Sequence, residues 1–377
     1  MEPVSGVDAI VVGAGAIGCT VAWRLAQAGA RVALVDRGET GGEASSAAAG
    51  IIGAQMEAQG PGPLLSLQVA SRALYPKLAD ELRELTGINV RCRIEGILQQ
   101  AFSPEEFEKL RARAAWQREA GLHAEWFESQ SSVHQSIREL GGSPAALAAL
   151  YAPDDGQIDN RLLVSALRLA ALRAGVSFLR ADARAVLEGG GRIRGVELLD
   201  ESKSVGRLDG RAVVVAAGAW SALLPGARIA EGAVRPIRGQ MIAIAATIPS
   251  GRVLTGGGGY AVPRADRVFI GATAEDVGFQ KQVTTNGLRG LLATAARLLP
   301  DLGDVEVLES WSGLRPGSRD GLPLLGKPER GPDGLFVCSG HFRSGILMTP
   351  ITGELMRDVV LGRPPTIDLT PFRPDRF

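Results

Sequence analysis

Three glycines near the amino terminus have the spacing of a phosphate-binding turn. Gly13, Gly15 and Gly18 follow the apolar run of residues 9–12 in the pattern G-x-G-x-x-G. The first glycine of this pattern permits a tight turn, the second lets the backbone approach a pyrophosphate, and the third lets a helix pack on a sheet. Asp36 lies 18 residues beyond Gly18, where a carboxylate can accept hydrogen bonds from ribose hydroxyls. These residues predict a dinucleotide site.

The segments around the glycines have the patterns of a strand, a helix and a second strand. The run before Gly13 predicts a buried strand, residues 17–28 predict a helix and residues 31–35 a second strand. The amino terminus of such a helix offers N–H groups and a partial positive charge to phosphates. The motif does not separate FAD from NAD. Its position at the start of the chain favours FAD, because the rest of the chain can then surround one permanently held cofactor.

Two later apolar runs predict strands beside the first one. Residues 211–221 end in Ala217, Gly218 and Trp220, and their small residues would again permit close contact with a nucleotide. Residues 335–339 predict another buried strand, followed by a glycine-containing loop. A helix over 346–361 follows, and its amino terminus is predicted to face an electron-rich ligand group.

Small residues dominate the segment 38–53. So little side-chain bulk suits a chain that lies flat against a rigid ligand, with Ser45 and Ser46 donating to phosphate. The alternative is a flexible linker, but linkers are rich in Gly and Ser and poor in Ala and Ile. Residues 143–150 predict a short helix or turn.

Residues 235–246, 253–255, 260–263 and 268–272 alternate in polarity and are broken by Gly and Pro, which predicts an antiparallel sheet. Gly256–Gly259 predict a flexible hinge before Tyr260. The fold class is therefore α/β, a Rossmann-like FAD-binding domain interleaved with an antiparallel-sheet α+β substrate domain. The predicted FAD-binding domain comprises residues 1–86, 150–225 and 316–377. The predicted substrate domain comprises residues 87–149 and 226–315.

Composition excludes several classes of function. The formal net charge is zero and 45% of the residues are apolar, which is ordinary for a globular protein and gives no basic excess for nucleic acid. The opening Met1-Glu2-Pro3 and the absence of a long apolar run predict neither a signal peptide nor a membrane span. Three scattered cysteines and three histidines predict no disulfide framework and no metal site; they are Cys19, Cys92, Cys338, His123, His134 and His341. A cytoplasmic location is expected.

Several motifs, taken in order, resemble the D-amino-acid oxidase family of FAD-dependent oxidoreductases, and within it the glycine oxidases of the thiamine pathway. The matching segments are residues 13–18, 41–50, 214–221, 260–264, 311–323 and 340–347. The resemblance implies FAD as cofactor. The FAD contacts that it implies, together with those of the turns above, are Gly13, Gly15, Ala16, Ile17, Gly18, Asp36, Arg37, Ala44, Ser45, Ala49, Gly50, Ile51, Ala183, Ala217, Gly218, Trp220, His341, Phe342, Arg343, Ser344, Gly345, Ile346 and Leu347.

The resemblance also implies a substrate pocket. Its carboxylate-binding arginine matches Arg315, its tyrosine matches Tyr260, and Arg343 either contacts substrate or holds the flavin loop. Ile51 is assigned to this pocket as well as to FAD. The glycine oxidases carry a histidine at the position of Gly258 and a methionine at that of Ala274. Both departures remove bulk, so slightly larger amines such as N-methylglycine are expected to fit.

The chemistry implied is oxidation of glycine and other small amines with O2 and water to glyoxylate, ammonia and H2O2. Hydride would pass from Cα to flavin N5 and needs no general base, so the residues must orient the substrate. Related sarcosine oxidases attach FAD through a cysteine near the segment of Arg315. None of the cysteines lies there, so FAD is expected to be non-covalent. The resemblance further implies a homo-oligomer, a tetramer.

The residues alone leave other functions open. Sarcosine or D-amino-acid oxidation would use the same scaffold, and a dehydrogenase would pass electrons to an acceptor other than O2. A flavin-holding subunit without turnover is disfavoured because both Arg315 and Tyr260 are retained.

Overall fold

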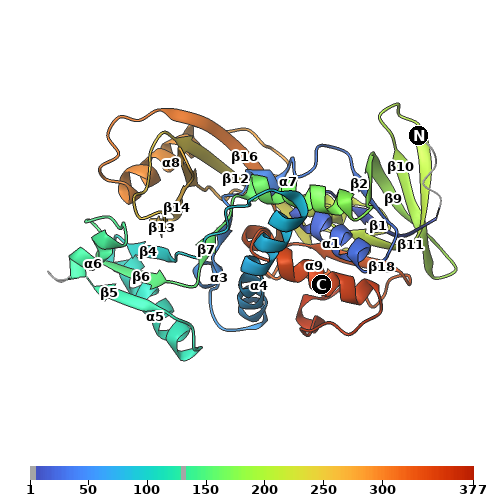
Figure 1. Cartoon of the computed structure of the whole chain (residues 1–377), viewed down its shortest axis with the longest axis horizontal. Helices are drawn as coiled ribbons and strands as arrows, with labels where there is room; N and C mark the ends of the chain where they lie inside the picture. Colours follow the sequence, from blue (N-terminus) through green and yellow to red (C-terminus); the bar gives the residue numbers. More distant parts are fainter. Residues whose placement is uncertain (1–5, 129–132) are drawn as a thin grey trace.

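A computed structural model of the chain describes residues 6–128 and 133–377, and it places two large sheets side by side (Figure 1). The first sheet has the strand order β17-β18-β11-β1-β2-β8. Its strands are β1 (Val7–Val12), β2 (Val32–Asp36), β8 (Ser177–Arg180), β11 (Val205–Val215), β17 (Leu324–Gly326) and β18 (Leu335–Ser339). All neighbouring pairs along this order are parallel except β17 with β18. The ribbon β9 (Asp182–Gly189) and β10 (Arg192–Leu199) extends β11 at one end.

Four helices pack together on the first sheet. They are α1 (Ala16–Gln27), α4 (Pro63–Thr86), α7 (Asn160–Arg173) and α9 (Thr349–Val360). Their apolar faces form a buried core with one face of the sheet, and this core includes Trp23, Leu67, Leu167 and Leu355. The apolar periodicity that predicted α1 is satisfied by this packing. The predicted helix over 346–361 begins later, at Thr349, because Pro350 favours the first turn of a helix and residues 342–344 form a 3-10 turn.

The second sheet has the order β16-β12-β15-β14-β13-β4-β6-β5 and is antiparallel except between β13 and β4. Its strands are β4 (Ile97–Ala101), β5 (Glu125–Glu128), β6 (Ala148–Ala152), β12 (Val234–Ile244), β13 (Val253–Gly256), β14 (Gly259–Pro263), β15 (Val268–Gly271) and β16 (Val307–Ser318). The helices α5 (Pro104–Glu119), α6 (Val133–Glu139) and α8 (Thr285–Leu298) belong to this half of the chain. In Figure 1 it lies to the left of the first sheet.

Two local predictions in this half differ from the structure. The short helix or turn predicted over 143–150 is confirmed as a turn at its start, where the Ala146 N–H donates to the Ser143 carbonyl oxygen, but it is wrong at its end, because Ala148–Ala152 form a buried strand between β4 and β5. The predicted hinge at Gly256–Gly259 is a tight hairpin between β13 and β14. Gly257 and Gly258 have φ of +59° and +80°, the values of a two-residue turn that suits the twist of paired strands.

Smaller elements connect the halves. They are α2 (Ala44–Ala47), β3 (Ile51–Ile52), α3 (Ala54–Glu57), β7 (Gly156–Gln157) and the 3-10 turns η1 (Gly218–Leu223), η2 (Phe342–Ser344) and η3 (Thr370–Phe372). The first sheet takes strands from 7–36, 177–215 and 324–339, and the second from 97–152 and 234–318. The limits of the two domains stay a prediction.

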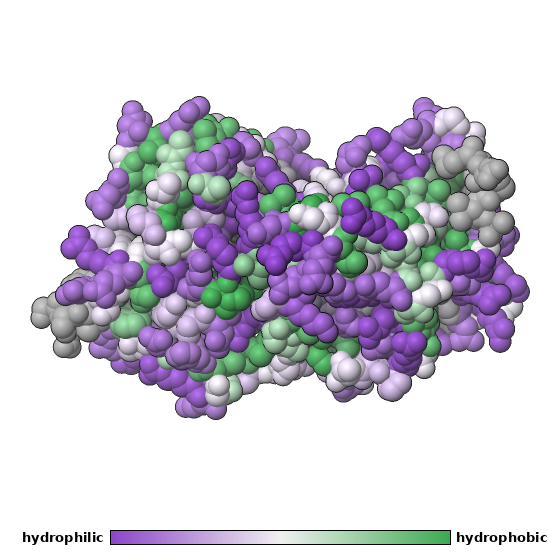
Figure 2. Space-filling model, in the orientation of Figure 1, coloured by the Kyte–Doolittle hydropathy of each residue, from purple (hydrophilic) through white to green (hydrophobic). Residues whose placement is uncertain are grey.

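In the described ranges, no helix is long and apolar enough to cross a membrane. The expectation about a signal peptide concerns residues 1–5, and that part of the chain lies outside the described residues, as does the side chain of His134. On the face shown in Figure 2, polar and apolar residues are intermixed, and the outline is indented between the two halves of the molecule.

Candidate cofactor and substrate site

A cavity of about 680 Å³ runs along the carboxyl ends of the parallel strands and reaches the second sheet. Val12, Asp36, Ala216 and Ser339 line it at or just beyond the ends of β1, β2, β11 and β18. In open α/β sheets, ligands bind at this edge. Tyr260 of β14 and residues 313–316 of β16 close the opposite end.

The glycine turn after β1 is shaped by close backbone contacts. Gly13 has a φ of +109°, and a Cβ atom there would lie 2.4 Å from the carbonyl oxygen of Ala216. A Cβ at Gly18 would lie 1.8 Å from the carbonyl oxygen of Gly13. Only glycine fits either place, so the spacing found in the sequence has the physical reason predicted for it. The turn thus brings α1 directly onto the end of β1.

Asp36 braces the glycine turn as well as facing the cavity. Its Oδ2 accepts from the Ala14 N–H at 2.6 Å, and its Oδ1 accepts from the Gly38 N–H at 2.8 Å. Carboxylate oxygens have further lone pairs, so the ribose contacts predicted for this residue remain available. Arg37, the next residue, has its guanidinium 4.4 Å from the ring centroid of Trp220, and both line the same end of the cavity.

The small-residue segment lies over the amino terminus of α1. Ser45 Oγ accepts from the Ala16 N–H at 2.9 Å, which leaves the hydroxyl proton of Ser45 to donate to another group. Asn160 donates to the carbonyl oxygen of Ser45 at 2.8 Å and so fixes this segment on α7. The first turn of a helix has N–H groups without intrahelical acceptors, which suits a phosphate at this place.

His341 lines the cavity beyond the end of β18. It is buried, and its Nε2 lies 3.1 Å from Thr352 Oγ1. Burial lowers the pKa of His341 to about 3, because the charged imidazolium would lose its hydration. The ring is therefore neutral at any pH at which such a protein is assayed.

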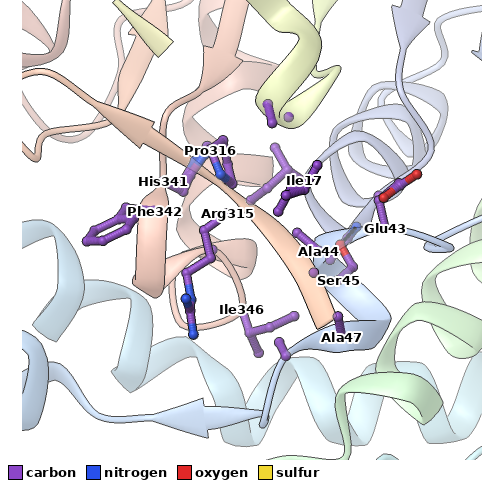
Figure 3. A pocket seen from close by; sticks show the side chains of 18 of the residues that line it. Ile17, Glu43, Ala44, Ser45, Ala47, Arg315, Pro316, His341, Phe342 and Ile346 are labelled. Carbon is purple, nitrogen blue, oxygen red and sulfur yellow. Dashed lines mark hydrogen bonds between the residues drawn. The ribbon is translucent and has the colours of Figure 1, made fainter. Parts of the chain in front are cut away.

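Arg315 is a residue of the long strand β16 and not of a surface turn. It stands opposite Ile237 of β12, and its Nη1 donates to the carbonyl oxygen of Thr273 at 2.9 Å. A Cβ at Gly239 would lie 2.3 Å from the guanidinium, so the neighbouring strand makes room for this side chain by having glycine there. In Figure 3, Arg315 projects from β16 beside Phe342 and Ile346.

Tyr260 stands next to Arg315 at this end. Its hydroxyl lies 3.7 Å from Met241 Sδ, and burial raises the pKa of Tyr260 while the nearby charge of Arg315 opposes that shift. In the described part of the chain, no carboxylate comes within 4.0 Å of Arg315, Arg343 or Arg113, all of which line the cavity. Cationic donors without a protein counter-ion suit an anionic ligand group.

The structure brings most of the predicted residues together. Twenty of the predicted FAD contacts line the cavity, and so do Arg315, Tyr260 and Gly258. Gly18, Ser344 and Leu347 do not line it: Gly18 packs on Gly13, Ser344 accepts from Gln68 and Leu347 is buried in the core. Ala274 is exposed and does not line the cavity either.

Sequence reasoning missed part of the cavity wall. Met56 and Glu57 from α3, Gln99 from β4 and Arg113 from α5 all line it. Arg113 donates to the Met56 carbonyl at 2.9 Å and to Gln99 Oε1 at 2.8 Å. The sequence gives no spacing that joins these elements, since they meet only through the second sheet. The single signal was the position of Glu57 just after the small-residue segment.

A family model described as "FAD dependent oxidoreductase" matches residues 8–359. The chain belongs to this FAD-dependent oxidoreductase family. It is 38% identical to a glycine oxidase of Geobacillus kaustophilus over 97% of this chain and 96% of that protein. It is 35% identical to a bifunctional protein ThiO/ThiG of Synechocystis sp., of which it covers 54%. The crystal structure of glycine oxidase from Geobacillus kaustophilus matches with a TM-score of 0.90 at 36% identity, covering 99% of both chains.

The cavity of this FAD-dependent oxidoreductase fits the cofactor that the family implies. Gly13 and Gly15 place no side chain where a pyrophosphate would approach. A Cβ at Gly15 would also crowd Ser45 Oγ, at 3.1 Å. Asp36 at the end of β2 is placed for ribose hydroxyls, and residues 341–343, 345 and 346 border another part of the cavity. The donors and the open backbone are those that a dinucleotide requires.

Proposed function

We propose that this FAD-dependent oxidoreductase oxidises glycine and other small amino acids or amines, with O2 as the electron acceptor. The observation that carries the proposal is the guanidinium of Arg315, which lines the cavity with Tyr260 and has no carboxylate of the described residues within 4.0 Å. The glycine oxidases to which the chain is similar at 30–38% identity support the same substrate class. The overall reaction converts glycine, O2 and water to glyoxylate, ammonia and H2O2.

The residues at this end would bind and orient the substrate. Arg315 would hold the carboxylate through two parallel hydrogen bonds. A hydrogen bond to a charged group stabilises a complex by about 1.5–3 kcal/mol. The hydroxyl of Tyr260 would donate to the same carboxylate. FAD, when bound, accepts the hydride from the substrate Cα. No side chain has to remove a proton if the amine is neutral, so the activity should rise towards alkaline pH as the substrate ammonium loses its proton.

A substrate slightly larger than glycine also suits the cavity. Gly258 lines the wall in the β13–β14 turn, and open space surrounds the position where its Cβ would stand. N-methylglycine and small D-amino acids are therefore within the proposed range. A dehydrogenase that uses another electron acceptor is the second candidate, because reaction with O2 depends on contacts of the reduced flavin rather than on the substrate residues.

We infer that FAD is held without a covalent bond. Cys338 lines the cavity, but it is buried, and burial raises the pKa of its thiol far above the ordinary range. A thiol without thiolate character is a poor nucleophile. Cys19 is also buried, and Cys92 lies outside the cavity. Acid precipitation should release all of the yellow colour into the supernatant; colour that stays with the precipitate would contradict this.

Anaerobic reduction of the flavin tests the activity. Glycine, N-methylglycine, D-alanine and D-proline are mixed in turn with the purified protein, and bleaching of the flavin absorbance is followed. Reduction by glycine within seconds, and formation of H2O2 once air is admitted, would support an oxidase. Reduction without H2O2 would favour the dehydrogenase. If none of these amines bleaches the flavin, the proposed function is wrong.

The setting of the reaction belongs to the same proposal. The resemblance to the glycine oxidases of the thiamine pathway supports a role in thiamine biosynthesis, a cytoplasmic location and a homotetramer. Mass measurement of the holoenzyme in solution tests the last of these.

A further inference from the structure

One carboxylate in the cavity has no hydrogen-bond partner within the described part of the chain. The carboxylate side chains that line the cavity are Asp36, Glu43, Glu57 and Asp182. Asp36 accepts from two backbone N–H groups, and Glu43 and Asp182 each pair with a basic side chain. Glu57 is held by neither kind of donor; only the charges of nearby arginines act on it. A carboxylate left without donors in a cavity is costly once a ligand displaces the water there.

Hydrogen bonds between α3 and Asp155 fix the backbone that carries Glu57. It is the last residue of α3, and the backbone N–H groups of Gln55 and Met56 in that helix donate to the buried carboxylate of Asp155 at 3.0 to 3.3 Å. Arg72 also donates to Asp155, at 2.6 Å. This buried network holds α3 against the neighbouring elements, so the fold fixes the backbone position of Glu57 at the cavity wall.

The charges around Glu57 are those of the substrate end. Arg315, Arg343 and Arg113 lie close enough to oppose the effect of burial, which raises the pKa of Glu57. The charge of Glu57 also helps to raise the pKa of Tyr260. These three cations, none of which has a carboxylate of the described residues within 4.0 Å, would attract the carboxylate of an amino acid but repel its positive end. A negative group is needed on the side where the amino group lies.

We propose that the carboxylate of Glu57 receives the amino group of the substrate while Arg315 holds its carboxylate. This inference rests on the proposed function. An amino acid carries both groups on one carbon atom, so two opposite charges facing one cavity can bind it at two points. A carboxylate accepts N–H bonds from an ammonium and from a neutral amine alike, so the contact persists when the amine loses its proton. Glu57 would therefore select amines over acids that lack nitrogen.

The test compares Glu57→Gln with wild type for two ligands that differ only in the amino group. The pair is 2-methylalanine, which has no Cα hydrogen to be oxidised, and isobutyrate. Each is titrated into the holoenzyme, and binding is measured from the change in the flavin spectrum. In the variant, 2-methylalanine should bind at least about tenfold more weakly, because a charged hydrogen bond is lost. Isobutyrate should bind as tightly as before or more tightly, because a repelling charge is gone.

The opposite signs separate this role from a structural one. If Glu57 only kept the arginines in place, both ligands would weaken by the same factor, and that result would overturn the inference, as would an unchanged affinity for 2-methylalanine. Glu57→Asp keeps the charge but withdraws it by one methylene, and it should keep part of the preference; this variant carries the test if Glu57→Gln does not fold. Glu105→Gln, an exposed ion-pair residue of α5, is the control for net charge.

Failure of the proposed function gives a different result. In that case, glycine and the other amines leave the wild-type flavin oxidised, whereas the comparison of 2-methylalanine with isobutyrate needs no turnover. Glycine itself adds a kinetic readout in an active enzyme. The dissociation constant for glycine, from the concentration dependence of anaerobic flavin reduction, should rise at least about tenfold in Glu57→Gln. An unchanged constant would count against the inference even where the enzyme turns over normally.

Discussion

At the scale of single residues, Arg315 is the first test. Arg315→Lys keeps the charge but loses the planar fork that matches a carboxylate, so kcat/KM for glycine should fall by about ten- to a hundredfold. The loss should come mainly through KM, and the FAD content should stay that of wild type. Steady-state kinetics with flavin absorbance checks both. Arg319→Lys, an exposed arginine of the same region, is the matched control. Equal loss in both variants would remove the assigned role.

His341 allows a second prediction at this scale, on stability. Its pKa of about 3 in the folded protein lies below the ordinary value of 6.5, so the unfolded chain takes up the proton first as the pH falls. The contribution of His341 to the free energy of unfolding is fully present above pH 6.5. It is lost as the pH falls below that value, by up to about 1.4 kcal/mol per pH unit. Denaturant unfolding at several pH values should show this slope in wild type and not in His341→Asn. His123→Asn, at an exposed position, should behave as wild type; equal slopes in all three would contradict the prediction.

The same residues show what sequence reasoning can reach. Gly13, Gly15 and Asp36 act through the backbone turn that they form themselves, so their spacing predicts their place. Arg315 was different: its local pattern is that of a surface turn, and only the family resemblance predicted a place in a substrate pocket. Glu57 was not predicted at all. The arginines near it come from β16, η2 and α5, and no short-range pattern in the sequence joins these elements.

At the scale of elements, Arg264 is the residue that ties the second sheet to the cavity wall. It follows β14, and its guanidinium donates to the carbonyl oxygens of Ala49 and Ile158 and to the side chain of Gln157. Among the described residues its Nε has no hydrogen-bond partner, and burial lowers the pKa of Arg264 to about 10. The described part of the chain places no carboxylate within 4.0 Å of it. Arg264 therefore acts as a clamp: its hydrogen bonds to backbone carbonyl groups hold the segments of Ala49 and Ile158 against the end of β14.

Replacing this clamp should loosen the cofactor. Arg264→Met leaves several buried carbonyl groups without donors, at about 1–3 kcal/mol for each group that stays unsatisfied. The thermal midpoint should fall by several degrees and the FAD dissociation constant should rise, because Ala49 and Gly50 line the cavity. Flavin fluorescence during dilution measures the second effect. Arg267→Met, in the same hairpin but paired with Asp266 and Glu309, is the control. If both variants release FAD equally, the clamp has no special part in holding it.

Predictions of elements succeeded where a segment interacts mainly with its own neighbours. The sequence Ser103-Pro104 is typical of a helix start, and Ser103 Oγ accepts from the Glu106 N–H at 3.2 Å as an N-cap should. They failed where the second sheet decided the outcome. The alanine-rich run at 148–152 has helical propensity, but both its edges pair with strands, so tertiary pairing overrides propensity.

At the scale of the whole molecule, one cavity joins segments from the start, middle and end of the chain. Its wall begins at Val12 and ends at Ile346, and both sheets contribute to it. A dinucleotide bound along it would contact the first sheet through its nucleotide part and the second through its redox ring. The interleaving of strands was predictable from the order of the motifs. The pairing of β4 with β13 was not, since Val253 pairs with Ile97, 156 positions earlier, and no local pattern spans that distance.

This arrangement predicts that FAD stabilises both sheets together. Protein stripped of FAD should unfold at a lower temperature, and free FAD at 100 times its dissociation constant should add about 2.7 kcal/mol to the free energy of unfolding. AMP occupies only the nucleotide end, so it should protect amides of β1 and β2 from hydrogen exchange but leave those of β14 and β16 unchanged. FAD should protect all four strands, in one cooperative transition. Two transitions, of which FAD moves only the one that belongs to the first sheet, would show that the redox ring does not reach Tyr260 and Arg315, and the substrate site would then have to be sought elsewhere.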